Sequence, residues 1–158
     1  MNRWFLVAAC VVIGACGGGN SSPVQDTNYG FTATISGSLG QRIQGGAVYV
    51  YDPGHLDSGG AVTLATDDVM FRIILGHAGG LLQTGTYAVE SQDKGPTYGA
   101  LMEGLTPWVF DGGTLTVTSA SSSTIAGSFN VTGNGSDVAR VAITGFFTAR
   151  LAPAPSGK

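Results

Sequence analysis

The sequence has few charged residues and an excess of glycine. Asp, Glu, Lys and Arg make up 11% of the 158 residues, less than half of the ~25% typical of soluble domains. The 26 glycines are more than twice the usual ~7% share. Exposed helices rely on Glu–Lys pairs and tolerate glycine badly, so the composition argues against a helical bundle. With only seven Lys and Arg and a net charge of −3, the chain lacks the basic stripe of a nucleic-acid-binding protein.

Cysteine is nearly absent. The chain has two cysteines, Cys10 and Cys16, both close to the N-terminus. The rest of the chain therefore has no disulfide and no thiolate for a metal or for catalysis. The hydrophobic fraction of 43% argues against disorder. We expect one domain held together by apolar burial, for which about 125 residues suffice.

The N-terminal residues follow the order of a secretory signal. Arg3 gives a positive start, an apolar run extends over residues 4–13, and the small residues Gly14 and Ala15 follow. The apolar run is shorter than the roughly 20 residues that a membrane-spanning helix needs. Residues 1–15 are therefore predicted to be a signal peptide that is removed.

The segment Ile13-Gly14-Ala15-Cys16 resembles the lipobox of bacterial lipoproteins, in which an aliphatic residue and two small residues precede a cysteine that is acylated before cleavage. The resemblance implies cleavage between Ala15 and Cys16, acyl chains (palmitate among them) on Cys16, and a Gly/Ser tether over residues 16–28. A second match ends at Cys10, but it would leave an apolar region of only about six residues. The alternative is an ordinary signal cut after Ala15, with Cys16 as a free thiol.

The residue after the expected lipidated cysteine bears on location. Lipoproteins that stay in the inner membrane carry Asp at this position, whereas this chain has Gly17. The resemblance therefore implies the outer membrane, with either face possible. Two or three acyl chains would anchor the protein stably.

Short alternating segments separated by glycine-rich turns occupy the rest of the chain. At residues 31–36, apolar and hydroxyl side chains alternate, which is typical of a half-buried strand. The apolar stretch 69–75 also fits a short helix, but its length and β-branched content favour a strand. The expected strands are residues 31–36, 47–51, 61–66, 69–75, 86–90, 97–102, 114–119, 123–132 and 138–150.

About eight or nine short strands at this spacing predict an all-β domain. We expect a single antiparallel β-sandwich over residues 29–151, with a small antiparallel β-barrel as the alternative, and a tail over residues 152–158. Gly112-Gly113 is predicted to be a tight turn between two strands, and Asn134-Gly135 a hairpin turn.

The C-terminal half resembles small bacterial lipoproteins of unknown function. The first similar segment, residues 113–118, begins with a Gly-Thr pair. The second, residues 125–131, contains Gly-Ser-Phe, and the third, residues 141–147, ends with Gly-Phe-Phe; Gly85-Thr86-Tyr87 is also similar. Ala126 stands where Ser is commoner. That family has no assigned activity, so the resemblance implies a β fold and no chemistry.

Sequence motifs for catalysis are missing. The chain has no G-x-S-x-G elbow, H-E-x-x-H, P-loop or G-x-G-x-x-G. Two histidines and several nearby carboxylates are the only metal-ligand or acid–base candidates, and their spacing is better explained by turn chemistry. They are His55, His77, Asp52, Asp57, Asp67 and Asp68; Glu90 and Glu103 show no pairing. We predict no catalytic residue, metal or cofactor.

Aromatic side chains are the better candidates for binding. Trp108 is the single tryptophan after the signal, and Phe110, Tyr98, Tyr49 and Tyr51 lie on expected strands or next to them. Exposed aromatics stack on sugars or contact protein partners. The alternative is that these side chains form the core.

These observations predict a lipid-anchored protein of the bacterial cell envelope with a non-enzymatic binding or structural role. Its partners would be the membrane, through the lipid, and an envelope protein or a glycan. One alternative is a small periplasmic hydrolase or metal-dependent enzyme that uses His55 and His77 with nearby Asp residues. Another is a lipocalin-like carrier of an apolar ligand, although Tyr29-Gly30-Phe31 lacks the tryptophan of that family's G-x-W.

Overall fold

The computed structural model describes residues 29–51, 59–135 and 139–152. These residues form nine strands and no helix. No helix in this part of the chain has the length and apolar character to cross a membrane. The strands are β1 (Gly30–Gly37), β2 (Gln41–Tyr51), β3 (Gly59–Ala65), β4 (Phe71–Ala78), β5 (Gly85–Ala88), β6 (Thr97–Glu103), β7 (Thr106–Ala120), β8 (Thr124–Asn134) and β9 (Arg140–Ala152).

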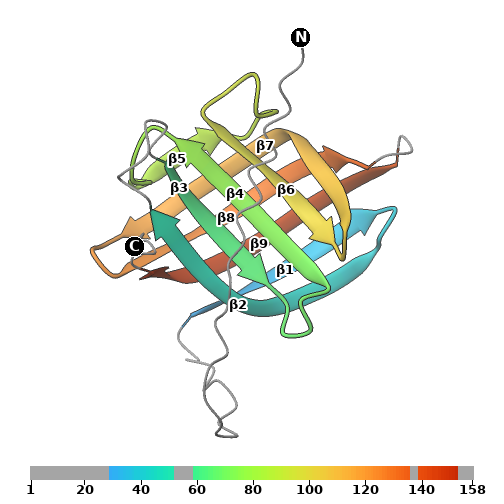
Figure 1. Ribbon diagram of the computed structural model, residues 1–158, viewed down its shortest axis with the longest axis horizontal. Helices are drawn as coiled ribbons and strands as arrows, with labels where there is room; N and C mark the ends of the chain where they lie inside the picture. Colours follow the sequence, from blue (N-terminus) through green and yellow to red (C-terminus); the bar gives the residue numbers. More distant parts are fainter. Residues whose placement is uncertain (1–28, 52–58, 136–138, 153–158) are drawn as a thin grey trace, which may run out of the picture.

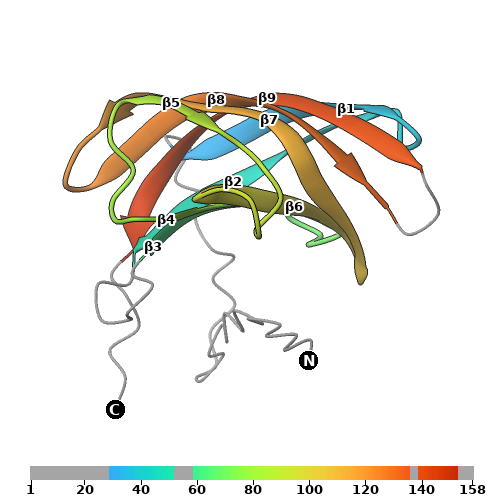
Figure 2. The same ribbon diagram turned by 90° about the horizontal axis from the view of Figure 1, so that it is seen from above.

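Eight of the strands form a closed antiparallel barrel. The sheet runs β7-β6-β4-β3-β2-β1-β9-β8, and β8 pairs back with β7 (Figure 1). The all-β class is confirmed, and of the two architectures expected the structure has the barrel. Figure 2 shows that the barrel is flattened, with β1, β7, β8 and β9 in one layer and β2, β3, β4 and β6 in the other.

Strand β5 is a ninth strand outside the closed ring. It pairs with residues 114–117 of β7, whereas β6 pairs with residues 106–109 of the same strand. Strand β7 therefore has two partners on one side and β8 along the other. Because β5 and β6 pair with different parts of β7, fewer backbone groups of β7 are left without a hydrogen-bond partner than at an open sheet edge.

The predicted turn at Gly112-Gly113 is wrong. Strand β7 passes through both glycines, and the ladder to β8 shifts there: Phe110 lies opposite Gly133, and Gly112 lies opposite Thr132. Asp111 is the extra residue of a β-bulge. The bulge allows Phe110 and Leu115, an odd number of residues apart, both to be fully buried.

The predicted strand at residues 69–75 is confirmed, although it begins later. Val69 and Met70 belong to the turn before β4, and Val69 has a positive φ of 58°. Strand β2 begins at Gln41, earlier than expected, because residues 41–45 pair with β1. The expected hairpin turn at Asn134-Gly135 extends into residues outside the described part of the chain.

Apolar side chains from all eight barrel strands fill the interior. Glycine is needed where strands or rings approach closely: a Cβ on Gly145 would lie 2.5 Å from the Phe129 ring and 2.7 Å from the Thr32 carbonyl oxygen. The buried set is Phe31, Ala33, Ile35, Ile43, Ala47, Tyr49, Val62, Leu64, Ile73, Leu75, Leu82, Val89, Leu101, Trp108, Phe110, Leu115, Val117, Ile125, Phe129, Val131, Val141, Ile143, Phe147 and Ala149.

The connection between β4 and β5 covers one end of the barrel. Figure 2 shows this segment crossing from one layer to the other. Leu82, in the middle of the connection, is 2% exposed and belongs to the core. Its backbone N–H donates to the hydroxyl oxygen of Tyr49 at 2.9 Å. Burial raises the pKa of Tyr49, so its hydroxyl stays neutral in this contact.

The Tyr49 hydroxyl is expected to stabilise this end of the barrel. Tyr49→Phe leaves the buried Leu82 N–H without its acceptor, so we expect the free energy of unfolding to fall by about 1–3 kcal/mol. Tyr51→Phe is the matched control, because the Tyr51 hydroxyl has no hydrogen bond to any described residue, so the expected change is below about 0.5 kcal/mol. Urea unfolding measures both. Equal losses for the two variants would contradict the assigned role of Tyr49.

Candidate functional site

Three of the five aromatic candidates belong to the core. Tyr49, Trp108 and Phe110 are 2%, 6% and 0% exposed. Trp108 donates from Nε1 to Glu103 Oε2 at 3.3 Å, and its ring lies so close to Gly135 that a Cβ there would be 2.9 Å away. These three side chains therefore pack in the core, which is the alternative that the sequence left open for them. Tyr51 and Tyr98 are half-buried.

His77 is held by structural contacts. Its Nδ1 lies 2.8 Å from the hydroxyl of Thr97, a buried residue, and its ring meets Tyr87 edge to face at 5.0 Å. Burial lowers the pKa of His77, which favours the neutral imidazole. The candidates His55, Asp52 and Asp57 lie outside the described residues.

Asp67 and Asp68 do not lie close to His77. Asp67 and Asp68 precede the first residue of β4, and His77 lies near its last, so roughly 20 Å of strand separates them. Asp68 accepts hydrogen bonds from the Thr66 hydroxyl at 2.5 Å and the Met70 N–H at 3.1 Å, and these bonds lower its pKa. In the described residues, no three His, Cys, Asp or Glu side chains are placed to hold a metal ion.

The outer surface of the layer formed by β7, β8, β9 and β1 has a different character. Register places Thr116, Ser128, Phe146 and Thr32 side by side in one row. The adjacent row contains Thr114, Asn130, Thr144 and Thr34. We call these eight residues the hydroxyl face. All eight are uncharged, and neighbouring side chains in each row are about 5 Å apart.

Phe146 is the one large apolar side chain of the hydroxyl face. It is 73% exposed, whereas the adjacent Phe147 is 4% exposed and lies in the core. The aromatic list from the sequence missed Phe146. The signal was available, because Val141, Ile143, Phe147 and Ala149 share one parity, so alternation places Phe146 on the opposite face.

A shallow depression of about 310 Å³ lies beside Phe146. Its floor is formed at Phe129 and Gly145, and the remaining lining residues are Thr114, Ser128, Asn130, Thr144 and Phe146. The side chains of Ser128, Asn130 and Thr144 make no hydrogen bond to another described residue. Exposed hydroxyl and amide groups are therefore available to a ligand next to an exposed aromatic ring.

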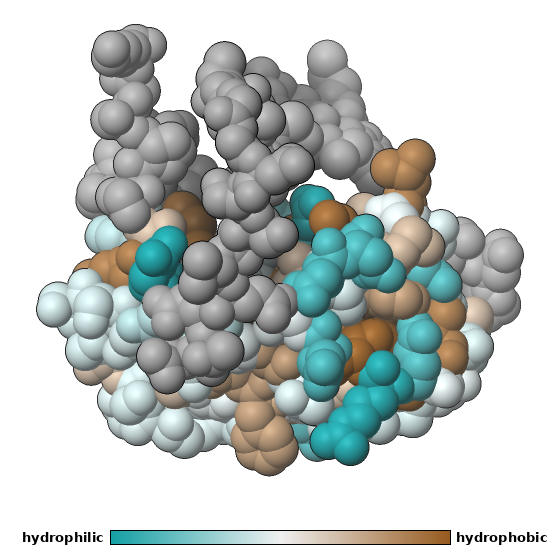
Figure 3. All heavy atoms as spheres, turned by 90° about the horizontal axis from the view of Figure 1, so that it is seen from below, coloured by the Kyte–Doolittle hydropathy of each residue, from teal (hydrophilic) through white to brown (hydrophobic). Residues whose placement is uncertain are grey.

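In Figure 3 this layer is seen edge-on along the lower side of the molecule, which is pale (intermediate hydropathy) at the left and has strongly hydrophilic and hydrophobic groups mixed at the right. A second set of exposed apolar residues lies on neighbouring turns: Val69 and Met70 between β3 and β4, and Leu105 between β6 and β7.

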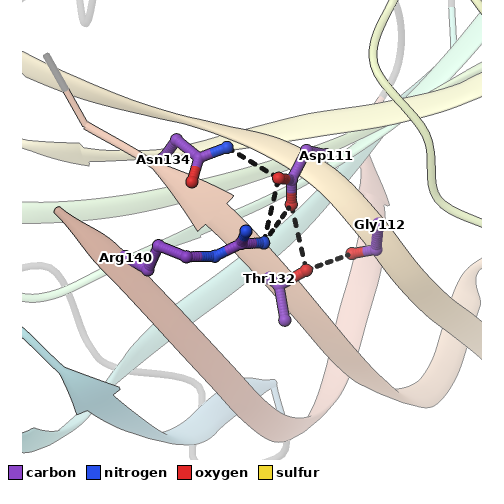
Figure 4. A network of polar contacts seen from close by, with 5 residues as sticks. All are labelled: Asp111, Gly112, Thr132, Asn134 and Arg140. Carbon is purple, nitrogen blue, oxygen red and sulfur yellow. Dashed lines mark hydrogen bonds and ion pairs between the residues drawn. The ribbon is translucent and has the colours of Figure 1, made fainter. Parts of the chain in front are cut away.

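An ionic network borders the hydroxyl face. The bulged residue Asp111 accepts hydrogen bonds from Thr132 Oγ1 at 3.0 Å, Asn134 Nδ2 at 2.6 Å and Arg140 Nη2 at 3.0 Å (Figure 4). Partial burial opposes ionisation of Asp111, but these hydrogen bonds and the Arg140 charge outweigh it and lower its pKa. The network joins β7, β8 and β9 and leaves the Asp111 carboxylate paired.

No known protein family, curated protein or solved structure matches this chain in comparisons of sequence and fold.

Asp111 is expected to contribute more to stability than its partner Arg140. Asp111→Ala removes three contacts at the bulge, and we expect a loss of about 1–2 kcal/mol in the free energy of unfolding. Arg140→Ala removes one exposed ion pair and should cost less than about 1 kcal/mol. Urea unfolding at neutral pH compares the variants, and a larger loss for Arg140→Ala would contradict this description.

The same variant gives a pH check. The pKa of Asp111 is lower in the folded than in the unfolded chain, so its stabilisation is complete above the unfolded value of about 3.9. This stabilisation is lost as the pH falls from the unfolded pKa through the lower pKa that Asp111 has in the folded chain. The difference between wild type and Asp111→Ala should therefore shrink in acid.

Proposed function

We propose that this chain is a lipid-anchored protein of the bacterial cell envelope that binds a partner through the hydroxyl face. The binding role is supported by the exposure of Phe146, whose ring is 73% exposed and lies beside side chains with free hydrogen-bonding groups. Solvent-exposed aromatic residues surrounded by polar groups are typical anchors of binding surfaces.

The anchor depends on the lipobox-like segment that ends at Cys16. Strand β1 begins at Gly30, close after the expected tether. A fully extended chain over residues 17–29 spans at most about 45 Å. In this proposal the lipid keeps the barrel near the outer membrane, and the hydroxyl face meets partners close to that membrane.

The proposal gives the domain no catalytic role. Support comes from the contacts that engage its acid–base candidates: His77 with Thr97 and Tyr87, and Asp68 with Thr66 and Met70. The packed interior also favours binding at the outer surface over the lipocalin-like alternative, in which an apolar ligand would occupy the inside of the barrel. Large side chains such as Phe110, Leu101 and Leu115 are fully buried inside the barrel.

Lipidation is tested with wild type and Cys16→Ala, both expressed in a Gram-negative host. Wild type should begin at residue 16, carry acyl mass on Cys16 and partition into the detergent phase, because two or three acyl chains anchor stably. Cys16→Ala should lack the acyl mass. Intact-mass spectrometry and detergent partition measure both properties. Release of soluble wild type with a different N-terminus and no acyl group would refute the anchor.

The binding face is tested with a photo-crosslinking amino acid placed at single positions in living cells. At Phe146 we expect adducts with envelope components, and at Leu105, which is 96% exposed on a turn, several-fold fewer. Replacing Thr144 with Lys should reduce the adducts at position 146, because a charge then occupies the depression. Equal adduct yields at positions 146 and 105 would count against the hydroxyl face.

A further inference from the structure

We infer that the ligand of the hydroxyl face is a neutral glycan, one ring of which packs on Phe146 while its hydroxyl groups bond to Ser128, Asn130 and Thr144. This inference rests on the proposed function and specifies the partner.

The chemistry of the depression fits a sugar ring. A pyranose presents C–H groups on one face and hydroxyl groups around its edge, so it needs an apolar surface and several hydrogen-bonding groups at once. Phe146 supplies the aromatic surface. The same depression is lined by Ser128, Asn130 and Thr144. Their side chains supply hydrogen-bond donors and acceptors that have no partner among the described residues.

The charge distribution favours a neutral ligand. None of the residues that line the depression is charged. The nearest acidic group along β7, Asp111, is paired with Arg140 at 3.0 Å. An anionic ligand would lose hydration at this site without gaining an opposite charge in contact with it, whereas a neutral ligand has no charge to desolvate.

The register offers contacts for more than one sugar. The depression includes Ser128 and Phe146 from one row of the hydroxyl face and Thr114, Asn130 and Thr144 from the other. Thr116 continues the first row on β7, and Thr34 continues the second on β1. A chain of sugars that extends across the strands would therefore meet further hydroxyl groups.

A second copy of the chain fits this face less well. Interfaces between identical subunits have a contiguous apolar centre, whereas here one apolar side chain lies among hydroxyl and amide groups. Pairing of strands between copies is also blocked on this layer, because β8 has partners on both sides along most of its length.

The test uses the full lipidated chain in a detergent without a sugar headgroup, such as a dimethylamine oxide. Chitotetraose, cellotetraose and maltotetraose are titrated separately, and amide NMR shifts give the affinity and the location of binding. We expect at least one glycan to shift the signals of residues 128, 130, 144 and 146. Phe146→Ala should weaken this binding about tenfold or more, and Asn130→Ala several-fold.

Two matched variants separate ring stacking from general damage. Phe146→Trp keeps an aromatic surface and should retain binding, and Leu105→Ala removes an even more exposed apolar side chain elsewhere and should leave binding unchanged. The inference is overturned if none of the glycans shifts these signals, or if Phe146→Ala binds as wild type does.

The outcomes distinguish this inference from the proposed function. If adducts still form at position 146 in cells but no glycan binds, the hydroxyl face binds a protein and only the glycan inference fails. If self-association depends on Phe146 in sedimentation velocity, a second copy occupies the face, which also overturns the inference. If neither adducts nor glycan binding occur, the proposed binding face fails as well.

Discussion

The ladder between β1 and β9, the first and the last of the nine strands, closes the sheet, and the interior and the hydroxyl face both depend on it. Without that ladder, the sheet would have two long open edges, and the backbone groups of both would need water or another chain. With it, the buried side chains of all eight strands face one shared interior. Closure also holds β7, β8, β9 and β1 side by side, which aligns the two rows of the hydroxyl face.

The β-bulge at Asp111 reconciles closure with packing. Strand β7 must bury Phe110 near one end of the barrel and Leu115 further along, and these residues have opposite parity in a regular strand. One extra residue corrects the parity and leaves Asp111 outside, where it bonds to side chains of β8 and β9. The same irregularity that completes the core therefore neutralises Arg140 at the border of the candidate binding surface.

Local pattern was a good guide to strands and a poor guide to which aromatic residues are exposed. Alternation predicted most of the strands because a side-chain period of two follows from the backbone alone. Trp108, Phe110 and Tyr49 were candidates either for binding or for the core, and they lie in the core, because residue type alone does not say which side of a strand faces the interior. Phe146 was overlooked although its parity relative to Ile143 places it outside. The Gly112-Gly113 pair predicts a turn from its composition, but a glycine-rich β-bulge has the same local composition.

By itself, the sequence determined the all-β class, the approximate positions of the strands and the expectation of an N-terminal lipid, since these depend on composition, alternation and a short local motif. Only the tertiary structure decided between barrel and sandwich, because both architectures require the same alternation and differ in whether the first strand, β1, also pairs with the last, β9, which is far away in the sequence. It also decided the composition of the hydroxyl face. That surface brings residues 32 and 34 next to residues 144 and 146, and such neighbours are created by strand register, which no local pattern encodes.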